Sequence, residues 1–383
     1  MNAADMGHRA MANLRQLARR PLRSVLPYDP GPSISELKAR YDIDEIVKLN
    51  WNEDLFGLLP GVRQAIIDEI RSTQLYPEQA YSDFRALVAK RSGAEPAMIM
   101  PSHGIQSLVL ATVSVFVNPG DRVVLSKPTY GLYRQACEAA GAEVVRVPTK
   151  GYRFDLEAML EAADGAKLVF VCDPNNPTGD ALMPEEWAAF MDELPDGCLA
   201  VVDEAYADYM PLEMRPKRID DVSAGRRVVV LRTFSKLFGI AGLRLGYAIA
   251  HPELIPCLDA VQEPFNVNRL ALAAGTACLA DPSAIESRRR EVVAARDRFA
   301  AQLKELGISC RPSNANFVLA QVGGDDQQWY ESLVRRGFLV RPGSEFDLTG
   351  HLRITVGPSP LMARVAAAMT EVARELREPV GRA

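Results

Sequence analysis

The sequence predicts an α/β protein with a mostly parallel central sheet and a second, smaller α+β part. Short apolar runs bounded by turn residues have the length of buried strands, and stretches with helical spacing lie between several of them. Strands that alternate with helices are typical of a parallel sheet covered on both faces. A length of 383 residues is too great for one compact core, so more than one domain is expected.

The elements of the larger domain follow from these patterns. Arginines near the beginning of the chain indicate a basic amphipathic arm rather than a transit peptide. The expected strands of the central sheet are 122–125, 143–147, 168–172, 199–202, 228–231 and 247–250. Helical spacing predicts helices between some of these strands, at 132–140 and 185–193.

From residue 284 to residue 306 the pattern changes to a long helix rich in Arg and Glu, where we expect the chain to leave the larger domain. Strands at 317–321, 338–341 and 352–356 and helices at 326–335 and 360–377 are expected after it. We therefore predict an arm with part of the small domain over residues 1–45, a large domain over 46–280, and a small domain over 281–383.

Composition and charge argue against several classes of function. The chain has 48% hydrophobic and 24% charged residues and no apolar run long enough to cross a bilayer, so membrane insertion is not expected. A net charge of -5 with interspersed signs offers no basic face to a nucleic acid. The cysteines form no C-x-x-C pair and the histidines are scattered, so neither a disulfide framework nor a metal site is expected. We expect a cytoplasmic protein.

Lys236 is the first candidate for chemistry, because the segment Arg232-Thr-Phe-Ser-Lys236 follows an apolar run directly. This places Lys236 at the carboxyl end of a buried strand, the edge at which open α/β sheets bind ligands. Taken alone, such a lysine is more often a surface residue whose stem packs on apolar neighbours. The neighbouring residues favour a functional role instead. Hydroxyls and a guanidinium suit a phosphate ester beside a lysine that bonds covalently to its ligand, and they are supplied by Ser235, Thr233 and Arg244.

Two more strand ends carry polar residues. Asp203 closes an apolar run, so its carboxylate needs a cationic partner, and a protonated ring nitrogen that helps the ring to accept electrons would be one. Tyr206 could hydrogen-bond an oxygen of the same ring, and Asn176 lies in the tight loop Asp173-Pro-Asn-Asn-Pro-Thr-Gly179 at the same edge. Without Lys236, an ion pair, a packed aromatic ring and an ordinary turn would be the simpler interpretations.

Together these motifs resemble fold-type I aminotransferases, which depend on pyridoxal 5'-phosphate (PLP), and they are most similar to the histidinol-phosphate aminotransferase family. The motifs are Asn175-Asn-Pro-Thr-Gly179, Asp203-Glu-Ala-Tyr206, Arg232-Thr-Phe-Ser-Lys236 and Ala241-Gly-Leu-Arg-Leu-Gly246. Further likeness covers nearly the whole chain, through Tyr28-Asp-Pro-Gly-Pro, Leu49-Asn-Trp-Asn-Glu53, Pro128-Thr-Tyr-Gly-Leu-Tyr133, Asn316-Phe317 and Leu352-Arg-Ile-Thr355. The resemblance implies the PLP-dependent transferase fold of type I, amino-acid and 2-oxo-acid substrates, and a homodimer with shared active sites.

The resemblance also implies a role for each residue that binds the cofactor. Lys236 would hold PLP covalently and act as the base, Asp203 would pair with the ring nitrogen, and Tyr206 with Asn176 would bond the ring oxygen. Tyr130 would stack on the ring face. The phosphate would be bound by Ser235, Thr233, Arg244 and the backbone around Gly104, Ile105 and Gln106, with Tyr76 reaching the phosphate of the neighbouring subunit.

On the substrate side, the resemblance implies that Arg353 clamps the α-carboxylate through two parallel hydrogen bonds, where the simpler interpretation is a surface ion pair. Asn176 would also face the substrate. We expect Arg341 to bind a distal phosphate and Tyr28 to help close the pocket.

Two segments depart from the histidinol-phosphate pattern. Asn52-Glu-Asp-Leu55 stands where that family usually has Asn-Glu-Asn-Pro, and Gly104-Ile-Gln-Ser107 stands where it usually has Gly-Ser-Asp-Glu. Histidinol phosphate with 2-oxoglutarate is the expected substrate pair. An aminotransferase for an aromatic or other bulky amino acid would keep the same cofactor residues, as would a decarboxylase similar to those of threonine phosphate. A non-catalytic PLP-binding sensor is the alternative from a different class.

Overall fold

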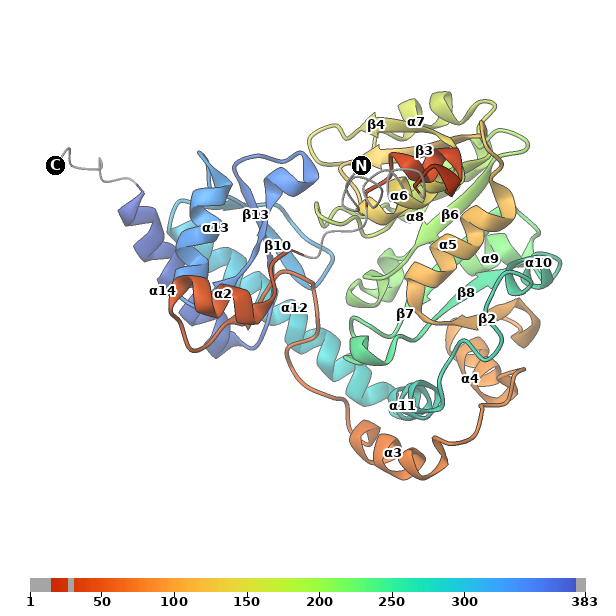
Figure 1. The fold of residues 1–383 in the computed structure, drawn as a ribbon, viewed down its shortest axis with the longest axis horizontal. Coiled ribbons are helices and arrows are strands. Elements are labelled where there is room, and N and C mark those ends of the chain that lie inside the picture. Colours follow the sequence, from red (N-terminus) through yellow and green to blue (C-terminus); the bar gives the residue numbers. More distant parts are fainter. Residues whose placement is uncertain (1–14, 27–30, 377–383) are drawn as a thin grey trace, which may run out of the picture.

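The computed structural model describes residues 15–26 and 31–376, which form a larger and a smaller lobe (Figure 1). A seven-stranded sheet of order β2-β8-β7-β6-β5-β3-β4 is the centre of the larger lobe. Its strands are β2 (Ile99–Ser102), β3 (Arg122–Lys127), β4 (Glu143–Pro148), β5 (Leu168–Cys172), β6 (Leu199–Asp203), β7 (Val228–Thr233) and β8 (Gly246–Ala250). The pairs from β7 to β4 are parallel, whereas β8 is antiparallel to β7 and to β2. The predicted mostly parallel sheet is confirmed, and β2 is a strand that we did not predict.

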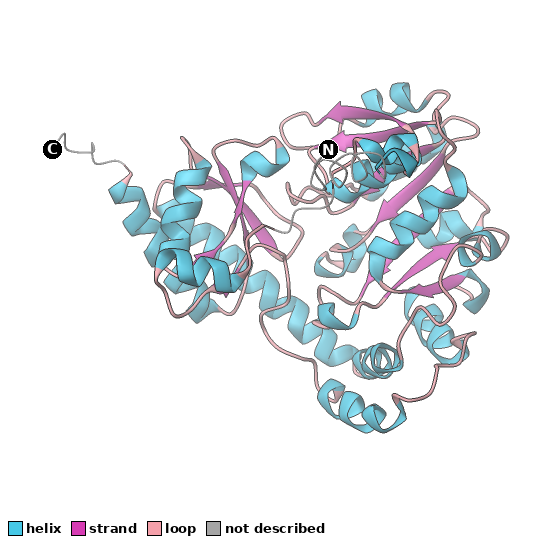
Figure 2. Cartoon of the chain, viewed as in Figure 1, coloured by secondary structure: helices cyan, strands magenta, loops and turns pink. Residues whose placement is uncertain are grey.

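Side chains of this sheet alternate between two apolar cores, one on each face. A strand buried on both faces is apolar at every position, which explains the continuous apolar runs in the sequence. Helices pack on both faces of the sheet (Figure 2). One core includes residues of α3 (Val62–Glu69), α4 (Ser82–Ser92), α7 (Leu156–Ala163), α8 (Pro184–Glu193), α9 (Arg218–Ser223) and α11 (Arg269–Ala280). The other includes residues of α5 (Gly104–Phe116), α6 (Gly131–Ala140) and α10 (Ile255–Asp259).

The smaller lobe contains a four-stranded sheet of order β12-β13-β10-β9, in which all neighbours are antiparallel. Its strands are β9 (Ser309–Cys310), β10 (Phe317–Gln321), β12 (Arg341–Pro342) and β13 (His351–Thr355). They share an apolar core with α12 (Pro282–Glu305), α13 (Asp326–Arg335) and α14 (Ser359–Glu375). The long helix α12 extends between the two lobes (Figure 1).

The prediction of one continuous strand over 338–341 is wrong, because the structure has two short strands there. β11 (Phe338–Leu339) pairs in parallel with β1 (Val47–Lys48), whereas β12 pairs with β13. The pairing partners lie far apart along the chain, so local periodicity could not reveal the change of sheet. Helix α2 (Ile34–Tyr41) also packs on this lobe, through Leu37 against Val334 and Leu339. The domain boundaries at residues 45 and 280 stay a prediction.

No helix within residues 15–26 and 31–376 combines the length and the apolar character that a bilayer span needs. In the same part of the chain, no group of at least three His, Cys, Asp or Glu side chains is placed to hold a metal ion. The cytoplasmic location stays a prediction.

Candidate active site

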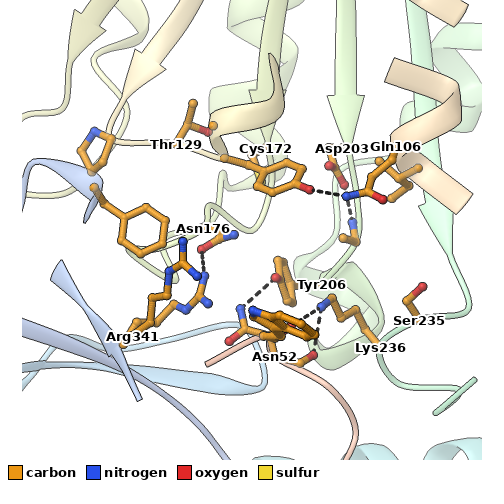
Figure 3. Close-up of a pocket in the computed structure, with 18 of the residues that line it drawn as sticks. Asn52, Gln106, Thr129, Cys172, Asn176, Asp203, Tyr206, Ser235, Lys236 and Arg341 are labelled. Carbon is orange, nitrogen blue, oxygen red and sulfur yellow. Dashed lines mark hydrogen bonds between the residues drawn. The ribbon is translucent and has the colours of Figure 1, made fainter. Parts of the chain in front are cut away.

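A cavity of about 780 Å³ opens at the carboxyl ends of the parallel strands and continues to the smaller lobe (Figure 3). Asn176, Asp203 and Lys236 line it from the larger lobe, and Arg341 and Arg353 line it from the smaller lobe. This volume suits a cofactor together with a small substrate. Other predicted site residues in its lining are Ile105, Gln106, Tyr130, Tyr206, Thr233, Ser235 and Arg244.

Lys236 follows β7 and points its amine across the cavity (Figure 3). Its Nζ donates hydrogen bonds to the backbone carbonyls of Trp51 and Asn52, both over 3.0 Å. Burial is the main cause that lowers the pKa of Lys236 to about 7, and the positive charge of Arg353 adds to it. The amine can therefore exist in its neutral form near neutral pH, as a nucleophile or a base requires.

Asp203 is the last residue of β6, and its carboxylate is buried. Burial raises its pKa to about 6, against the lowering effects of a hydrogen bond from Tyr133, the backbone N–H of Ala205 and the charge of Lys236. The hydroxyl of Tyr133 donates to Oδ2 of Asp203 over 2.6 Å. Sequence reasoning missed Tyr133, although it stands one helical turn after Tyr130 in the same motif.

An anion cradle, which we define as Gln106, Thr233, Ser235 and Arg244, occupies one end of the cavity. Nη1 of Arg244 donates to the hydroxyl of Ser235 over 3.3 Å, and Nη2 donates to Oε1 of Gln106 over 3.1 Å. The hydroxyl of Thr233 accepts from the backbone N–H of Ser235. Gly104 begins α5, so its end of the cavity also has unpaired helix N–H groups, which favour a phosphate.

Gly104 does not itself line the cavity, but it lies against the guanidinium of Arg244, which does. Its φ of +78° is a conformation that residues with a side chain rarely adopt, and a Cβ there would lie 2.8 Å from Nη2 of Arg244. The cradle therefore depends on glycine at this position. Gln106 also donates to the hydroxyl of Tyr130 over 3.0 Å, so the residue that departs from the family pattern is part of the site.

Arg353 lies on β13 and is buried. Its guanidinium donates to the side-chain oxygen of Asn176 and to the backbone carbonyl of Asn50. Arg353 and Asn176 both line the cavity, and their roles toward a substrate stay a prediction. The arrangement leaves a planar cation in the position where a carboxylate ligand could be clamped.

Asn52 is a second residue that sequence reasoning missed. Its side-chain amide donates to the hydroxyl of Tyr206 over 2.9 Å (Figure 3), and its backbone N–H donates to the hydroxyl of Thr355. Asn52 also has a positive φ of 55°, which asparagine tolerates better than most residues. The segment Leu49-Asn-Trp-Asn-Glu53, which resembles the family, could have indicated Asn52 as a site residue.

Charged side chains surround the mouth of the cavity. Arg341 forms an ion pair with Glu345, and Asp347 pairs with Arg146 over 2.9 Å and with Lys127 over 3.3 Å. Arg146 and Lys127 belong to β4 and β3, so the ion pairs of Asp347 connect the two lobes. Arg134 and Arg146 also line the cavity, which makes its outer end rich in guanidinium groups.

A buried ion-pair network lies next to the strand ends that carry the site. Arg218 binds both Asp173 and Glu204, and Glu204 also accepts from Arg232 over 2.6 Å. Burial alone would raise the pKa of Glu204, but Arg232 and Arg218 bring it below its usual value. Breaking such a network by removing one partner costs about 3–5 kcal/mol, so these charges stabilise the contacts between the ends of β5, β6 and β7 as a set.

Tyr76, predicted to bind a phosphate, lies at the surface of the protein. Tyr76 has 77% of its surface exposed and stacks on Phe265 with ring centroids 4.6 Å apart. It does not line the cavity of its own chain, and its predicted contact with a neighbouring subunit stays a prediction. Tyr28 lies outside the described residues.

Comparison with known proteins agrees with this architecture. The sequence pattern of the family "Aminotransferase class I and II" matches residues 44–369. The histidinol-phosphate aminotransferase of Symbiobacterium thermophilum is 37% identical over 340 residues, which are 88% of this chain and 94% of that protein. That of Moorella thermoacetica is 35% identical over 341 residues, with 88% of each chain covered.

Among solved structures, the histidinol-phosphate aminotransferase of Sinorhizobium meliloti in complex with pyridoxal-5'-phosphate has a TM-score of 0.87 at 30% identity, covering 94% of this chain and 98% of that one. The L-threonine-O-3-phosphate decarboxylase of Porphyromonas gingivalis has a TM-score of 0.76 at 23% identity, covering 87% and 100%, and shares the fold. The resemblance in the motifs and the fold prediction are confirmed. The chain therefore belongs to the class I and II aminotransferases.

Proposed function

We propose that this protein is a PLP-dependent aminotransferase that transfers an amino group between histidinol phosphate and 2-oxoglutarate. One observation carries the proposal: Lys236, Asp203 and the anion cradle around Arg244 face one cavity at the carboxyl ends of neighbouring strands. The names of its relatives and the PLP complex of the Sinorhizobium meliloti enzyme support the choice of substrate and cofactor.

The residues of the cavity fit PLP group by group. The anion cradle suits the phosphate, and glycine at residue 104 leaves room for the guanidinium of Arg244. Asp203 would pair with the ring nitrogen, and Tyr206 with Asn176 would bond the ring oxygen. Tyr130 would cover one face of the ring, and the amine of Lys236 would bond to the aldehyde carbon. The buried carboxylate of Asp203 gains the cationic partner that its burial calls for.

In the reaction, each residue would have a separate task. When bound, PLP would accept the electron pair left on the substrate Cα after its proton departs. The neutral Nζ of Lys236 would take that proton from Cα and deliver it to the former aldehyde carbon of the cofactor, and its pKa of about 7 suits both steps. Arg353 would clamp the α-carboxylate of glutamate, a group that histidinol phosphate lacks, and the hydrogen bond to Asn176 would hold its guanidinium in place. This fixes which substrate bond is oriented to break.

For the distal phosphate of the substrate, Arg341 at the outer end of the cavity is the proposed partner. Its side chain is mostly buried and pairs with Glu345, so a phosphate would have to compete with that carboxylate. Tyr28 would contribute to closing the pocket.

We also propose a homodimer in which Tyr76 reaches the cofactor phosphate of the neighbouring subunit. Exposed apolar side chains near Tyr76, namely Ile67, Ile70 and Leu75, support an interface there. The backbone carbonyl of Tyr76 accepts from Arg269, and its ring stacks on Phe265, so the side chain is held at the surface. Light scattering, which measures the molecular mass in solution, would test the dimer. Tyr76→Phe should weaken PLP binding and leave the molecular mass of the dimer unchanged.

The proposal is tested by mixing the PLP-loaded protein in turn with histidinol phosphate, glutamate, phenylalanine, tyrosine and threonine phosphate. We expect the absorbance of bound PLP to change to that of pyridoxamine phosphate with histidinol phosphate and with glutamate. Conversion with an aromatic amino acid in place of histidinol phosphate would keep the mechanism and replace the substrate. Release of carbon dioxide from threonine phosphate would make the protein a decarboxylase.

A matched pair of lysine variants completes the test. Lys236→Arg keeps the positive charge but cannot bond covalently to PLP, so its spectrum should be that of free aldehyde. Lys167→Arg changes an exposed lysine outside the cavity and should behave as the wild type. An unchanged cofactor spectrum in Lys236→Arg would contradict the proposed role of Lys236.

A further inference from the structure

Tyr133, on α6, binds the carboxylate of Asp203 at the end of β6. Its hydroxyl donates to Oδ2 of Asp203 over 2.6 Å, the length of a charge-assisted hydrogen bond to a carboxylate. Oδ1 accepts from the backbone N–H of Ala205 over 2.9 Å. Each carboxylate oxygen therefore has its own donor, and two donors together fix the orientation of the group.

The ring of Tyr133 cannot easily move away from this position. It is 0% exposed and stacks on Phe170 of β5, with centroids 5.0 Å apart and an interplanar angle of 12°. The ring of Tyr130 meets it edge to face at 5.4 Å. Because aromatic neighbours hold the ring, the hydroxyl is already in place before any ligand arrives.

We propose that Tyr133 is a positioning residue of the active site, whose hydroxyl keeps the carboxylate of Asp203 ionised and oriented toward the cavity. This inference rests on the proposed function, because it gives Asp203 the role of pairing with the ring nitrogen of the cofactor. An ionised Asp203 keeps that nitrogen protonated, and a protonated ring is the better electron acceptor. Tyr133 itself would touch neither cofactor nor substrate.

The electrostatics around Asp203 agree with this role. Burial raises the pKa of Asp203 to about 6, and the hydrogen bond from Tyr133 is the largest of the influences that lower it. The titratable groups that face it are Tyr133, Cys172, Glu204, Tyr206 and Lys236. Burial raises the pKa of both tyrosines and of the thiol, so these groups stay neutral. The charged neighbours that remain are Glu204, which raises the pKa of Asp203, and Lys236, which lowers it.

The first experiment follows the carboxyl carbon of Asp203 by ¹³C NMR in the full-length, cofactor-free protein labelled at aspartate. Asp203→Asn assigns the signal. Reading the carboxyl itself is necessary because Lys236, with a pKa of about 7, titrates close by. Loss of a hydrogen bond to a charged group should raise the pKa of Asp203 in Tyr133→Phe by roughly one to two pH units.

Tyr209→Phe is the matched control. Tyr209 is 2% exposed, and its buried hydroxyl has no hydrogen-bond partner among residues 15–26 and 31–376. Removing that hydroxyl changes the same chemical group in a similar environment and should leave the titration of Asp203 unchanged. If Tyr133→Phe also left the titration unchanged, the proposal would be overturned.

A fluorotyrosine at position 133 covers the case in which Tyr133→Phe does not fold. It keeps the ring and makes the hydroxyl a stronger donor, so the pKa of Asp203 should fall below the wild-type value. A rise, or no change, would contradict the proposal.

With PLP bound, the effect on the reaction should depend on pH. For Tyr133→Phe we expect kcat to fall roughly tenfold at pH 6.5, with a much smaller loss at pH 8.5 and little change in KM. An equal loss at both pH values would indicate a merely structural role. Failure of the proposed function would look different, because wild-type protein would then show no transamination while the titration of the cofactor-free protein still reported on Tyr133 and Asp203.

Discussion

The guanidinium of Arg353, on β13, donates a hydrogen bond to the side-chain oxygen of Asn176, in the loop after β5. This contact joins the smaller lobe to the larger lobe inside the cavity. It also means that the residue proposed to bind the substrate carboxylate is oriented by a residue proposed to bind the cofactor.

Arg353→Lys should lower kcat/KM for glutamate roughly a hundredfold, because an ammonium cannot form two parallel bonds to a carboxylate. Steady-state kinetics with glutamate measures the effect. Arg364→Lys changes an arginine outside the main cavity and should leave kcat/KM unchanged. Equal values of kcat/KM in the two variants would contradict the proposed role of Arg353 as the carboxylate clamp.

Lys236→Met should change how the stability of the cofactor-free protein depends on pH. The pKa of Lys236 is lowered from 10.5 to about 7, so between these values the folded protein binds fewer protons than the unfolded chain. The free energy of unfolding of the wild type therefore gains from this residue as pH rises from about 7 to 10.5. Methionine does not titrate, so the variant lacks this gain.

We expect Lys236→Met to be more stable than wild type by about 2 kcal/mol at pH 7, with the difference disappearing as pH approaches 10.5. Partial exposure of the amine and its two lost hydrogen bonds reduce the difference from the value that the full pKa change would imply. Urea unfolding at several pH values measures it, with Lys167→Met as the exposed control. A difference that stayed constant with pH would contradict the lowered pKa.

Gly104→Ala should weaken PLP binding, since the new Cβ would lie 2.8 Å from Nη2 of Arg244. Gly93→Ala is the matched control, because its φ of +71° is similar to the +78° of Gly104 but nothing lies within 4 Å of its Cβ position. Both variants should lose roughly 1 kcal/mol or more of stability from backbone strain. Only Gly104→Ala should raise the dissociation constant of PLP, which a fluorescence titration measures.

Arg341→Ala should raise KM for a phosphorylated amino donor at least roughly tenfold and leave KM for glutamate unchanged. Tyr28→Phe should act in the same direction with a smaller effect. Comparison of histidinol phosphate with histidinol, and of both with glutamate, isolates the contribution of the phosphate. Unchanged affinity for the phosphorylated substrate would exclude both residues from that role.

Much of the fold and several residues of the candidate site could be predicted from the sequence. The strands β3 to β8 of the central sheet end within two residues of the ends of the apolar runs, so the side chains that follow them, such as Lys236 and Asn176, were expected at one edge. The structure places them in one cavity. Gly104, Asn176, Asp203 and Lys236 belong to motifs of neighbouring residues, which is why sequence reasoning found them.

Contacts between residues far apart in the sequence could not be predicted from it. Tyr133 and Asp203 are 70 residues apart, and Asn52 and Tyr206 are 154 residues apart, so no local pattern links them. The same holds for the network of Arg218 with Asp173 and Glu204, because a buried arginine on a short helix looks like a surface residue in the sequence.

The sequence by itself determined the order and type of the elements, the strand ends and the motifs of the family, because hydrophobic period, turn residues and strand termini are encoded by neighbours along the chain. Only the tertiary structure decided which side chains meet: Tyr133 with Asp203, Asn52 with Tyr206, and Asp347 with Arg146. Those contacts arise from packing between distant segments. Packing also sets the burial that brings the pKa of Lys236 to about 7 and that of Asp203 to about 6.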